Sequence, residues 1–171
     1  MKTMTKKNRR DCMKLKSALC LLMIAAATPA LAGGTGNHSH DELAIGAPGK
    51  AGKAKRTVNI TMSETADGKM IFQPASFTAK EGETLRLKFY NKGETDHEFV
   101  MDKMKAILEH KAVMEKFPEM EHDDPNAIRL APGKRGEIVW TFTKAGTFAF
   151  GCLIPGHYEA GMKGDIEVAT K

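Results

Sequence analysis

Short stretches in which apolar and polar residues alternate recur through the C-terminal two thirds of the chain. In residues 84–90, Leu85, Leu87 and Phe89 occupy every second position, as a strand with one buried face requires. The runs that predict strands are residues 57–62, 70–78, 84–90, 137–143, 147–151 and 164–168. Turn residues such as Asp-Gly, Asn-Lys-Gly and Pro-Gly separate them. This pattern predicts an all-β domain, either a β-sandwich or a barrel.

One stretch has a different period. In residues 102–118, Met104, Ile107, Leu108 and Met114 follow one another at spacings that place them on one side of a helix. The pattern therefore predicts a short helical insertion in the β-rich domain.

The first 32 residues have the features of a secretory signal peptide. Seven Lys and Arg residues precede or flank the apolar run at residues 18–27, and a small-x-small motif ends at Ala32. The run is about ten residues long, which is too short for a helix to cross a bilayer core of about 30 Å. We therefore expect cleavage after Ala32, a periplasmic mature protein and no membrane anchor after cleavage. Arg9 and Arg10 leave a twin-arginine route open beside the ordinary one.

The rest of the chain divides into a leader and one domain. Residues 33–56 are rich in Gly, Ala and Lys and lack a sustained apolar period, which predicts a flexible leader. Residues 57–171 are long enough for one hydrophobic core but not for two.

Removal of the signal peptide changes the charge balance. The whole chain has a formal net charge of +5. Residues 1–32 account for seven of the 26 basic and one of the 21 acidic residues, which leaves 19 and 20 and a net charge of −1. A nearly neutral protein gives no electrostatic reason to expect nucleic-acid binding. We expect a monomer.

Cleavage also leaves a single thiol. Cys12 and Cys20 lie within the signal peptide, so Cys152 has no partner for a disulfide within the mature chain. In an oxidising compartment a lone thiol is open to oxidation unless something occupies it, and a bound metal would do so.

Three residues near the C-terminus form the motif Cys-x4-His-x4-Met, at Cys152, His157 and Met162. A loop of this length can close on one ion, and His97, which follows a predicted strand, offers a second imidazole. Two imidazoles, a thiolate and a weak axial thioether are the ligands of trigonal blue-copper sites. Each residue alone is more often a packing or surface residue than a ligand, but their combination favours a copper site.

The same residues resemble those of a known family. The spacing from Cys152 to Met162 is similar to that of rusticyanin-type cupredoxins. The segment, together with His-Glu-Phe-Val at residues 97–100, resembles bacterial periplasmic copper-tolerance cupredoxins. The resemblance covers roughly residues 57–171 and implies a Greek-key β-sandwich with one type 1 copper at one end.

The resemblance also implies roles for individual residues. It carries over the copper ligands His97, Cys152, His157 and Met162. It implies that Asn91 helps to fix the ligand loop by hydrogen bonding. Glu98 stands where several relatives have Asn or Ser, so the groups that tune the reduction potential differ from theirs.

Two functions compete on this evidence. In the first, the protein has a part in copper tolerance and its partners are copper-handling proteins. In the second, it is a soluble electron carrier between respiratory redox partners. For either, His157 is the expected electron route, and Pro155, Tyr158 and Ala160 around it predict a modestly apolar docking patch. A third interpretation, an interaction module without metal, requires the ligand set to be accidental.

We do not expect an enzyme. Multicopper oxidases flank the corresponding Cys with His residues that hold a trinuclear cluster, whereas Gly151 and Leu153 flank Cys152. The chain's six His residues are also too few for that cluster.

Further Met and His residues predict additional copper binding. Met114, Met120 and His122, in and after the predicted helix, form a candidate accessory site. His38 and His40 in the leader could bind Cu(II) or Zn(II). The alternative interpretation is that the methionines pack the helix onto the sandwich. Binding of more than one ion would favour copper buffering over electron carriage.

Overall fold

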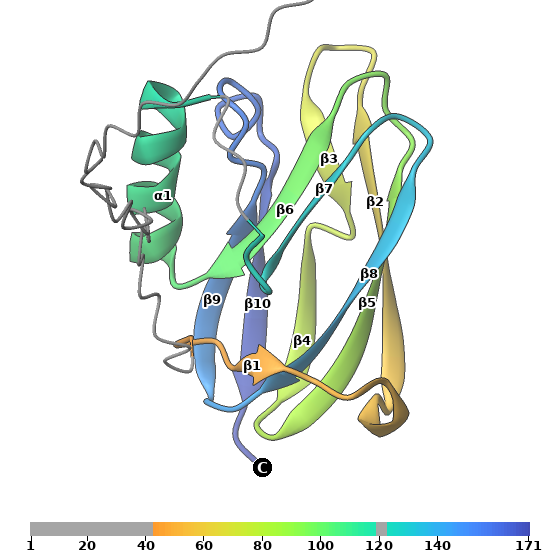
Figure 1. The fold of residues 1–171 in the computed structure, drawn as a ribbon, viewed down its shortest axis with the longest axis vertical. Helices are drawn as coiled ribbons and strands as arrows, with labels where there is room; N and C mark the ends of the chain where they lie inside the picture. The colour runs from red at the N-terminus through yellow and green to blue at the C-terminus, as the bar shows by residue number, and fades with distance from the viewer. Residues whose placement is uncertain (1–42, 119–122) are drawn as a thin grey trace, which may run out of the picture. The chain divides into compact units, whose positions relative to one another are not determined.

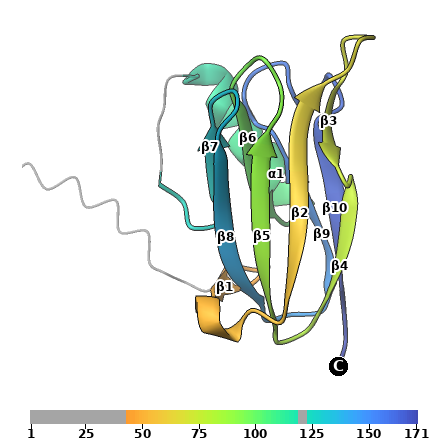
Figure 2. The same ribbon diagram turned by 90° about the vertical axis from the view of Figure 1, so that its right-hand side faces the viewer.

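The computed structural model describes residues 43–118 and 123–171, which form two packed β-sheets and one α-helix (Figures 1 and 2). The first five-stranded sheet has the order β1 (Ala47–Pro48), β8 (Arg135–Phe142), β5 (Glu83–Asn91), β2 (Arg56–Glu64), β3 (Met70–Gln73). The second has the order β4 (Ser76–Lys80), β10 (Lys163–Ala169), β9 (Gly146–Gly151), β6 (His97–Asp102), β7 (Ala127–Leu130). The pairs β2/β5 and β4/β10 are parallel and the other pairs are antiparallel. The predicted all-β sandwich is confirmed.

The predicted strand over residues 70–78 is in fact two strands. It divides at Pro74 into β3, which belongs to the first sheet, and β4, which belongs to the second. Proline has no N–H to donate to a sheet ladder, so the chain leaves one sheet at this residue and joins the other. The sequence contained this signal, and the prediction of one continuous strand was wrong.

Strand β6 was missed because its residues do not alternate. Five of its six residues, from His97 to Met101, are buried, and a strand covered on both faces has no polar face to produce the period of two. One face lies against the main core. Here Phe99 contacts the rings of Phe89 and Phe150 at centroid distances of 4.7 and 5.1 Å. This aromatic packing anchors the strand that begins with His97.

The other face of β6 is covered by the predicted helical insertion. Helix α1 (Met104–Lys116) buries Ile107 and Met114 in a second apolar cluster. Its other members are Val100, Ala149, Leu153 and Tyr158. An ion pair strengthens the attachment, because Lys111 Nζ lies 2.5 Å from a carboxylate oxygen of Glu159, which follows β9. Helix α1 therefore packs on β6 and on the segment after β9.

Part of the predicted leader is packed against the domain. Ile45 is wholly buried in the main core, and its carbonyl accepts a hydrogen bond from Trp140 Nε1 at 3.4 Å. Strand β1 pairs with β8, and a 3-10 helix, η1 (Ala51–Lys53), follows it. One buried isoleucine in a Gly- and Ala-rich stretch creates no period, which is why the sequence pattern did not reveal it. Residues 1–32 and 33–42 lie outside the described residues.

In the part of the chain that the structure describes, no helix has both the length and the apolar character needed to cross a membrane.

Gly164, in β10, lies tightly between the β3–β4 link and Phe150 of β9. A Cβ at this residue would overlap the carbonyl oxygen of Ala75 and the ring of Phe150. We expect Gly164→Ala to lower the free energy of unfolding by about 3 kcal/mol, the upper end for overpacking, measured by urea denaturation of the metal-free protein. Gly52→Ala is the control, because a Cβ there meets no atom within 4 Å. Equal stability of the two variants would contradict this packing.

Candidate metal centre

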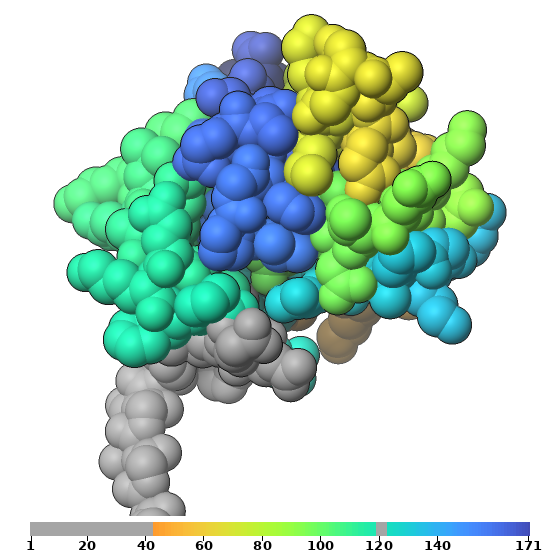
Figure 3. Space-filling model, turned by 90° about the horizontal axis from the view of Figure 1, so that it is seen from above, coloured from red at the N-terminus to blue at the C-terminus, as the bar shows by residue number. Residues whose placement is uncertain are grey.

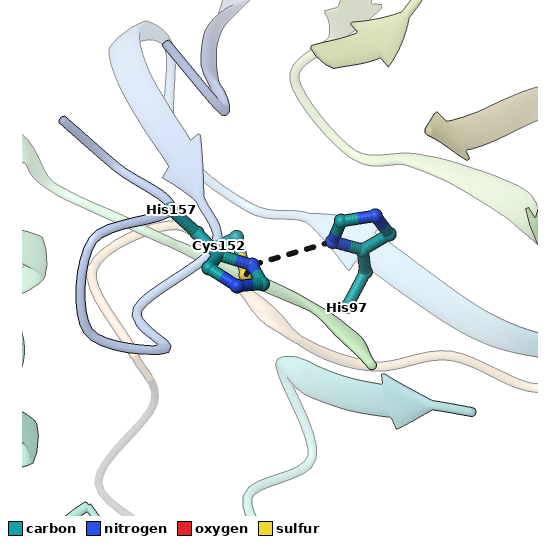
Figure 4. Close-up of side chains that lie close together, drawn as sticks. All are labelled: His97, Cys152 and His157. Carbon is teal, nitrogen blue, oxygen red and sulfur yellow. Dashed lines mark hydrogen bonds between the residues drawn. The ribbon is translucent and has the colours of Figure 1, made fainter. Parts of the chain in front are cut away.

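Three side chains from distant parts of the chain converge at one end of the sandwich. His97 begins β6, Cys152 directly follows β9, and His157 lies on the loop from β9 to β10. Their ligand atoms all lie within 4.8 Å of one another. His157 Nδ1 is 3.3 Å from both His97 Nδ1 and Cys152 Sγ, and Figure 4 shows the three groups facing one another. The structure thus brings together three of the four predicted ligands around one point.

The loop that carries Cys152 and His157, residues 152–162, is closed by its own backbone. Cys152 N–H donates to the carbonyl of Met162 at 3.0 Å, and Met162 N–H donates to the carbonyl of His157 at 3.0 Å. Gly156 and Gly161 have φ angles of +88° and +102°, a region that favours glycine. These turns fix the spacing of the ligand atoms. We call residues 152–162 the ligand loop.

Met162, the predicted axial ligand, is wholly buried at the end of the ligand loop. Its side chain belongs to the same core cluster as Cys152. This burial is compatible with a ligand that faces the site from inside the protein. The role of Met162 as a ligand stays a prediction.

The ligand loop reaches the molecular surface. Figure 3, seen from above, shows it between the β2–β3 hairpin and the segment that contains α1. Within it Pro155 is exposed and His157 and Ala160 are partly exposed. Tyr158 is buried, and its hydroxyl donates to Met104 Sδ at 3.6 Å on α1. The predicted docking patch was therefore wrong in one member, because Tyr158 faces the helix and not the solvent.

Burial raises the pKa of the Cys152 thiol to about 12. Two backbone groups act in the opposite direction and favour the thiolate: Glu98 N–H donates to Cys152 Sγ at 3.3 Å, and the backbone of Ile154 adds a second hydrogen bond. At neutral pH the metal-free thiol keeps its proton, and a metal ion must displace it.

The two imidazoles have pKa values below that of ordinary histidine. Burial is the main cause for both. For His157 the neighbouring His97 adds to the effect, whereas for His97 the Glu64 carboxylate opposes it. Both rings are therefore neutral at pH 7, the state in which imidazole binds metals.

The donor set fits copper. Nitrogen and sulfur donors about 2.0–2.3 Å from a shared ion lie roughly 3.5 Å apart in a trigonal arrangement. The two separations at His157 Nδ1 are 3.3 Å, and all three ligand atoms lie within 4.8 Å of one another. Two imidazoles and one thiolate are the trigonal ligands of blue-copper sites.

Asn91 supports the site, although not where it was expected. It is wholly buried at the end of β5. Its Nδ2 donates to the carbonyls of Thr95 and Leu130 at 2.8 Å each, and its Oδ1 accepts from Gly93 N–H at 2.9 Å. Two of these bonds hold the segment that precedes His97, residues 92–96, and the third ties Asn91 to the end of β7; none of them reaches the ligand loop.

Sequence reasoning missed Glu64, at the end of β2. Its Oε1 lies 3.1 Å from His97 Nε2, the ring nitrogen that faces away from the other ligands. No motif or short spacing links the two residues, so only the packing of β2 beside the 92–96 segment could reveal the contact.

Only one of the residues predicted to bind additional copper, Met114, lies in the described part of the chain. Met114 is 1% exposed and packs in the apolar cluster under α1, which favours the packing interpretation for this residue. Met120, His122, His38 and His40 lie outside the described residues, so copper binding by them stays a prediction.

A family comparison agrees with this donor set. Residues 58–169 match the model of the copper binding proteins of the plastocyanin/azurin family. The match spans nearly the whole sandwich, from β2 to β10, and includes all four predicted ligands.

Individual proteins that this chain resembles are also copper proteins. The chain is 49% identical over 134 residues to the copper-resistant cuproprotein CopI of Rubrivivax gelatinosus, covering 78% of this chain and 79% of that one. It is 33% identical to the CopI of Pseudomonas aeruginosa, covering 73% and 82%. Among solved structures, reduced auracyanin of Roseiflexus castenholzii has a TM-score of 0.57 at 27% identity, covering 68% of this chain and 98% of that one.

Proposed function

Because this chain belongs to the plastocyanin/azurin family of copper-binding proteins, we propose that it is a periplasmic type 1 copper protein with a part in copper tolerance. The proposed copper ligands are His97, Cys152, His157 and Met162. The observation that carries the proposal is the convergence of a buried thiol and two neutral imidazoles on one point.

Copper held by such ligands exchanges one electron between Cu(I) and Cu(II). The chain supplies the geometry for both states. The thiolate is fixed by the Glu98 N–H, and the ligand loop is closed by backbone bonds between Cys152, His157 and Met162. Such a framework limits rearrangement when the oxidation state changes. The partial exposure of His157 supports its role as the electron route.

The relatives' names support tolerance over dedicated electron carriage. Those at 49% and 33% identity are copper-resistant cuproproteins, and the chain covers about four fifths of their length. On this proposal its partners are copper-handling proteins. The alternative, a soluble electron carrier, is favoured by the fact that the described residues form one His-Cys-His cluster, since a carrier needs one ion. We propose no enzymatic activity, because Gly151 and Leu153 place no imidazole beside Cys152.

A copper titration tests the proposal. We expect the chain without residues 1–32 to develop an intense thiolate-to-copper absorption band that saturates at one equivalent of Cu(II). Uptake of further equivalents without added band intensity would support copper buffering by the accessory residues. Absence of the band in a folded protein would overturn the type 1 site.

A growth experiment separates the two functions. A strain that lacks the protein is grown at increasing copper concentrations, with and without the wild-type gene. Tolerance predicts that the wild-type gene restores growth at high copper and that a His157→Ala gene does not. Unchanged growth of the deletion strain would favour the electron carrier.

A further inference from the structure

We propose that Glu64 is a positioning residue of the copper site, one that orients His97 and favours Cu(II) over Cu(I). This inference rests on the proposed copper function. It concerns Glu64, a residue that is not one of the predicted copper ligands. The juxtaposition that carries it is a fixed carboxylate against the outer nitrogen of a buried metal-binding imidazole.

The contact determines which nitrogen of His97 is free to bind metal. A neutral imidazole carries one proton, and a carboxylate can pair only with the nitrogen that bears it. Glu64 Oε1 lies 3.1 Å from Nε2, whereas Nδ1 faces His157. The proton therefore belongs on Nε2, and Nδ1 presents its lone pair to the site. Carboxylate–histidine–metal arrangements of this kind fix the tautomer and raise ligand basicity.

The imidazole has little else to pair with on that side. His97 is wholly buried, and in residues 43–118 and 123–171 its Nε2 has no polar partner apart from the Glu64 carboxylate. The approach of Glu64 Oε1 at 3.1 Å is therefore what compensates this buried nitrogen.

The carboxylate is held in place by the segment that precedes His97. Glu64 Oε2 accepts from Glu94 N–H at 3.0 Å, and Oε1 accepts from Thr95 N–H at 3.2 Å and from Thr95 Oγ1 at 2.7 Å. All three of these donors favour the ionised carboxylate over its protonated form. Glu64 is thus a fixed anion at neutral pH.

The backbone around the pair is fitted to it. A Cβ at Gly93 would lie 2.7 Å from His97 Nε2 and would overlap the Glu64 carboxylate. The chain can pass this close only with glycine at this position. The 92–96 segment, Glu64 and His97 therefore form one packed unit beside the metal ligands.

The charge has a definite effect on the copper couple. A fixed anion next to a ligand stabilises the more positive oxidation state, so Glu64 lowers the reduction potential. If Glu64 only supported the 92–96 segment, its removal would leave the balance between Cu(II) and Cu(I) unchanged. The reduction potential therefore separates an effect on the copper site from a purely structural role.

The test compares reduction potentials of the copper-loaded protein. We expect Glu64→Gln to lower the ratio of Cu(II) to Cu(I) affinity by about tenfold, which is a rise of about 59 mV for a one-electron couple. Glu64→Ala, measured beside it, should shift the potential in the same direction. Asp67→Asn is the charge control, because Asp67 lies on the same β2–β3 hairpin and pairs with Lys69. Thr95→Val is the structural control, because it removes a hydrogen bond to Glu64 and keeps the charge.

The outcomes are distinct. A potential for both Glu64 variants equal to that of Asp67→Asn or Thr95→Val would overturn the inference and leave the type 1 site intact. A second readout is the nitrogen-15 NMR spectrum of the diamagnetic Cu(I) protein, in which His97 should carry its proton on Nε2. A proton on Nδ1 would also contradict the inference. If the wild-type protein shows no Cys152-dependent band, the proposed function itself fails.

Discussion

Replacement of Cys152 by Ser is expected to abolish the intense visible band and to lower copper affinity by well over the roughly 100-fold that loss of an outer hydrogen bond costs. The thiolate is the strong soft donor of the set, and a serine hydroxyl does not ionise to replace it. Affinity is measured by competition with a chelator, and the band by absorption spectroscopy.

Cys152→Ser should also lose the pH dependence of copper affinity that the thiol creates. Because the pKa of Cys152 is raised to about 12, the wild-type thiol binds a proton from pH 7 to 9 that copper must displace. Wild-type affinity should therefore rise about tenfold per pH unit in this range, and the affinity of Cys152→Ser should rise far less. The urea midpoint of the metal-free variant shows whether it folds. If Cys152→Ser kept the visible band, or if copper affinity rose equally with pH in both proteins, Cys152 would be a core residue and not a ligand.

Replacement of Asn91 by Leu is expected to lower the free energy of unfolding by about 3 kcal/mol or more. The change leaves three backbone groups without their partner, the carbonyls of Thr95 and Leu130 and the N–H of Gly93. A buried polar group that loses its hydrogen bond costs about 1–3 kcal/mol. The measurement is urea denaturation of the metal-free protein.

Asn59→Leu is the matched control, because Asn59 is exposed on β2 and surface substitutions change stability by about 0.5 kcal/mol or less. We also expect Asn91→Leu to weaken copper binding, since the 92–96 segment orients His97 through Glu64. Equal stability of the Asn91 and Asn59 variants would show that the buried amide has no such role.

The parts of the site that could be predicted from sequence are those encoded locally. Cys152 and His157 lie within one loop, so their spacing alone indicates a shared ion; the same spacing predicts Met162 as a ligand, and that role stays a prediction. His97 was found because it follows a strand rich in alternating residues, although the structure shows that it begins another strand. The thiol, imidazole and thioether of the ligand loop thus predict copper from residues that are close in sequence.

The parts that could not be predicted depend on contacts across the sandwich. Glu64 and Thr95 are 31 positions apart, and nothing in either segment indicates that they meet. Strand β6 has no alternation because both its faces are covered, and Ile45 lies in a short Gly- and Ala-rich stretch that has no period. The role of each of these residues depends on what packs against it in the fold, and not on its neighbours in sequence.

The separation of the ligands along the chain has a thermodynamic consequence. His97 and His157 are 60 positions apart, and their meeting requires β6 and β9 to be paired. An unfolded chain offers the ion only the donors of residues 152–162, whereas the folded chain adds His97 and holds the donors close together, so the folded chain binds the ion more tightly. Ligand binding to the native state alone adds about 2.7 kcal/mol of stability when free ligand is at 100 times Kd. We therefore expect the resistance of this protein to unfolding and proteolysis to rise with the copper content of its surroundings.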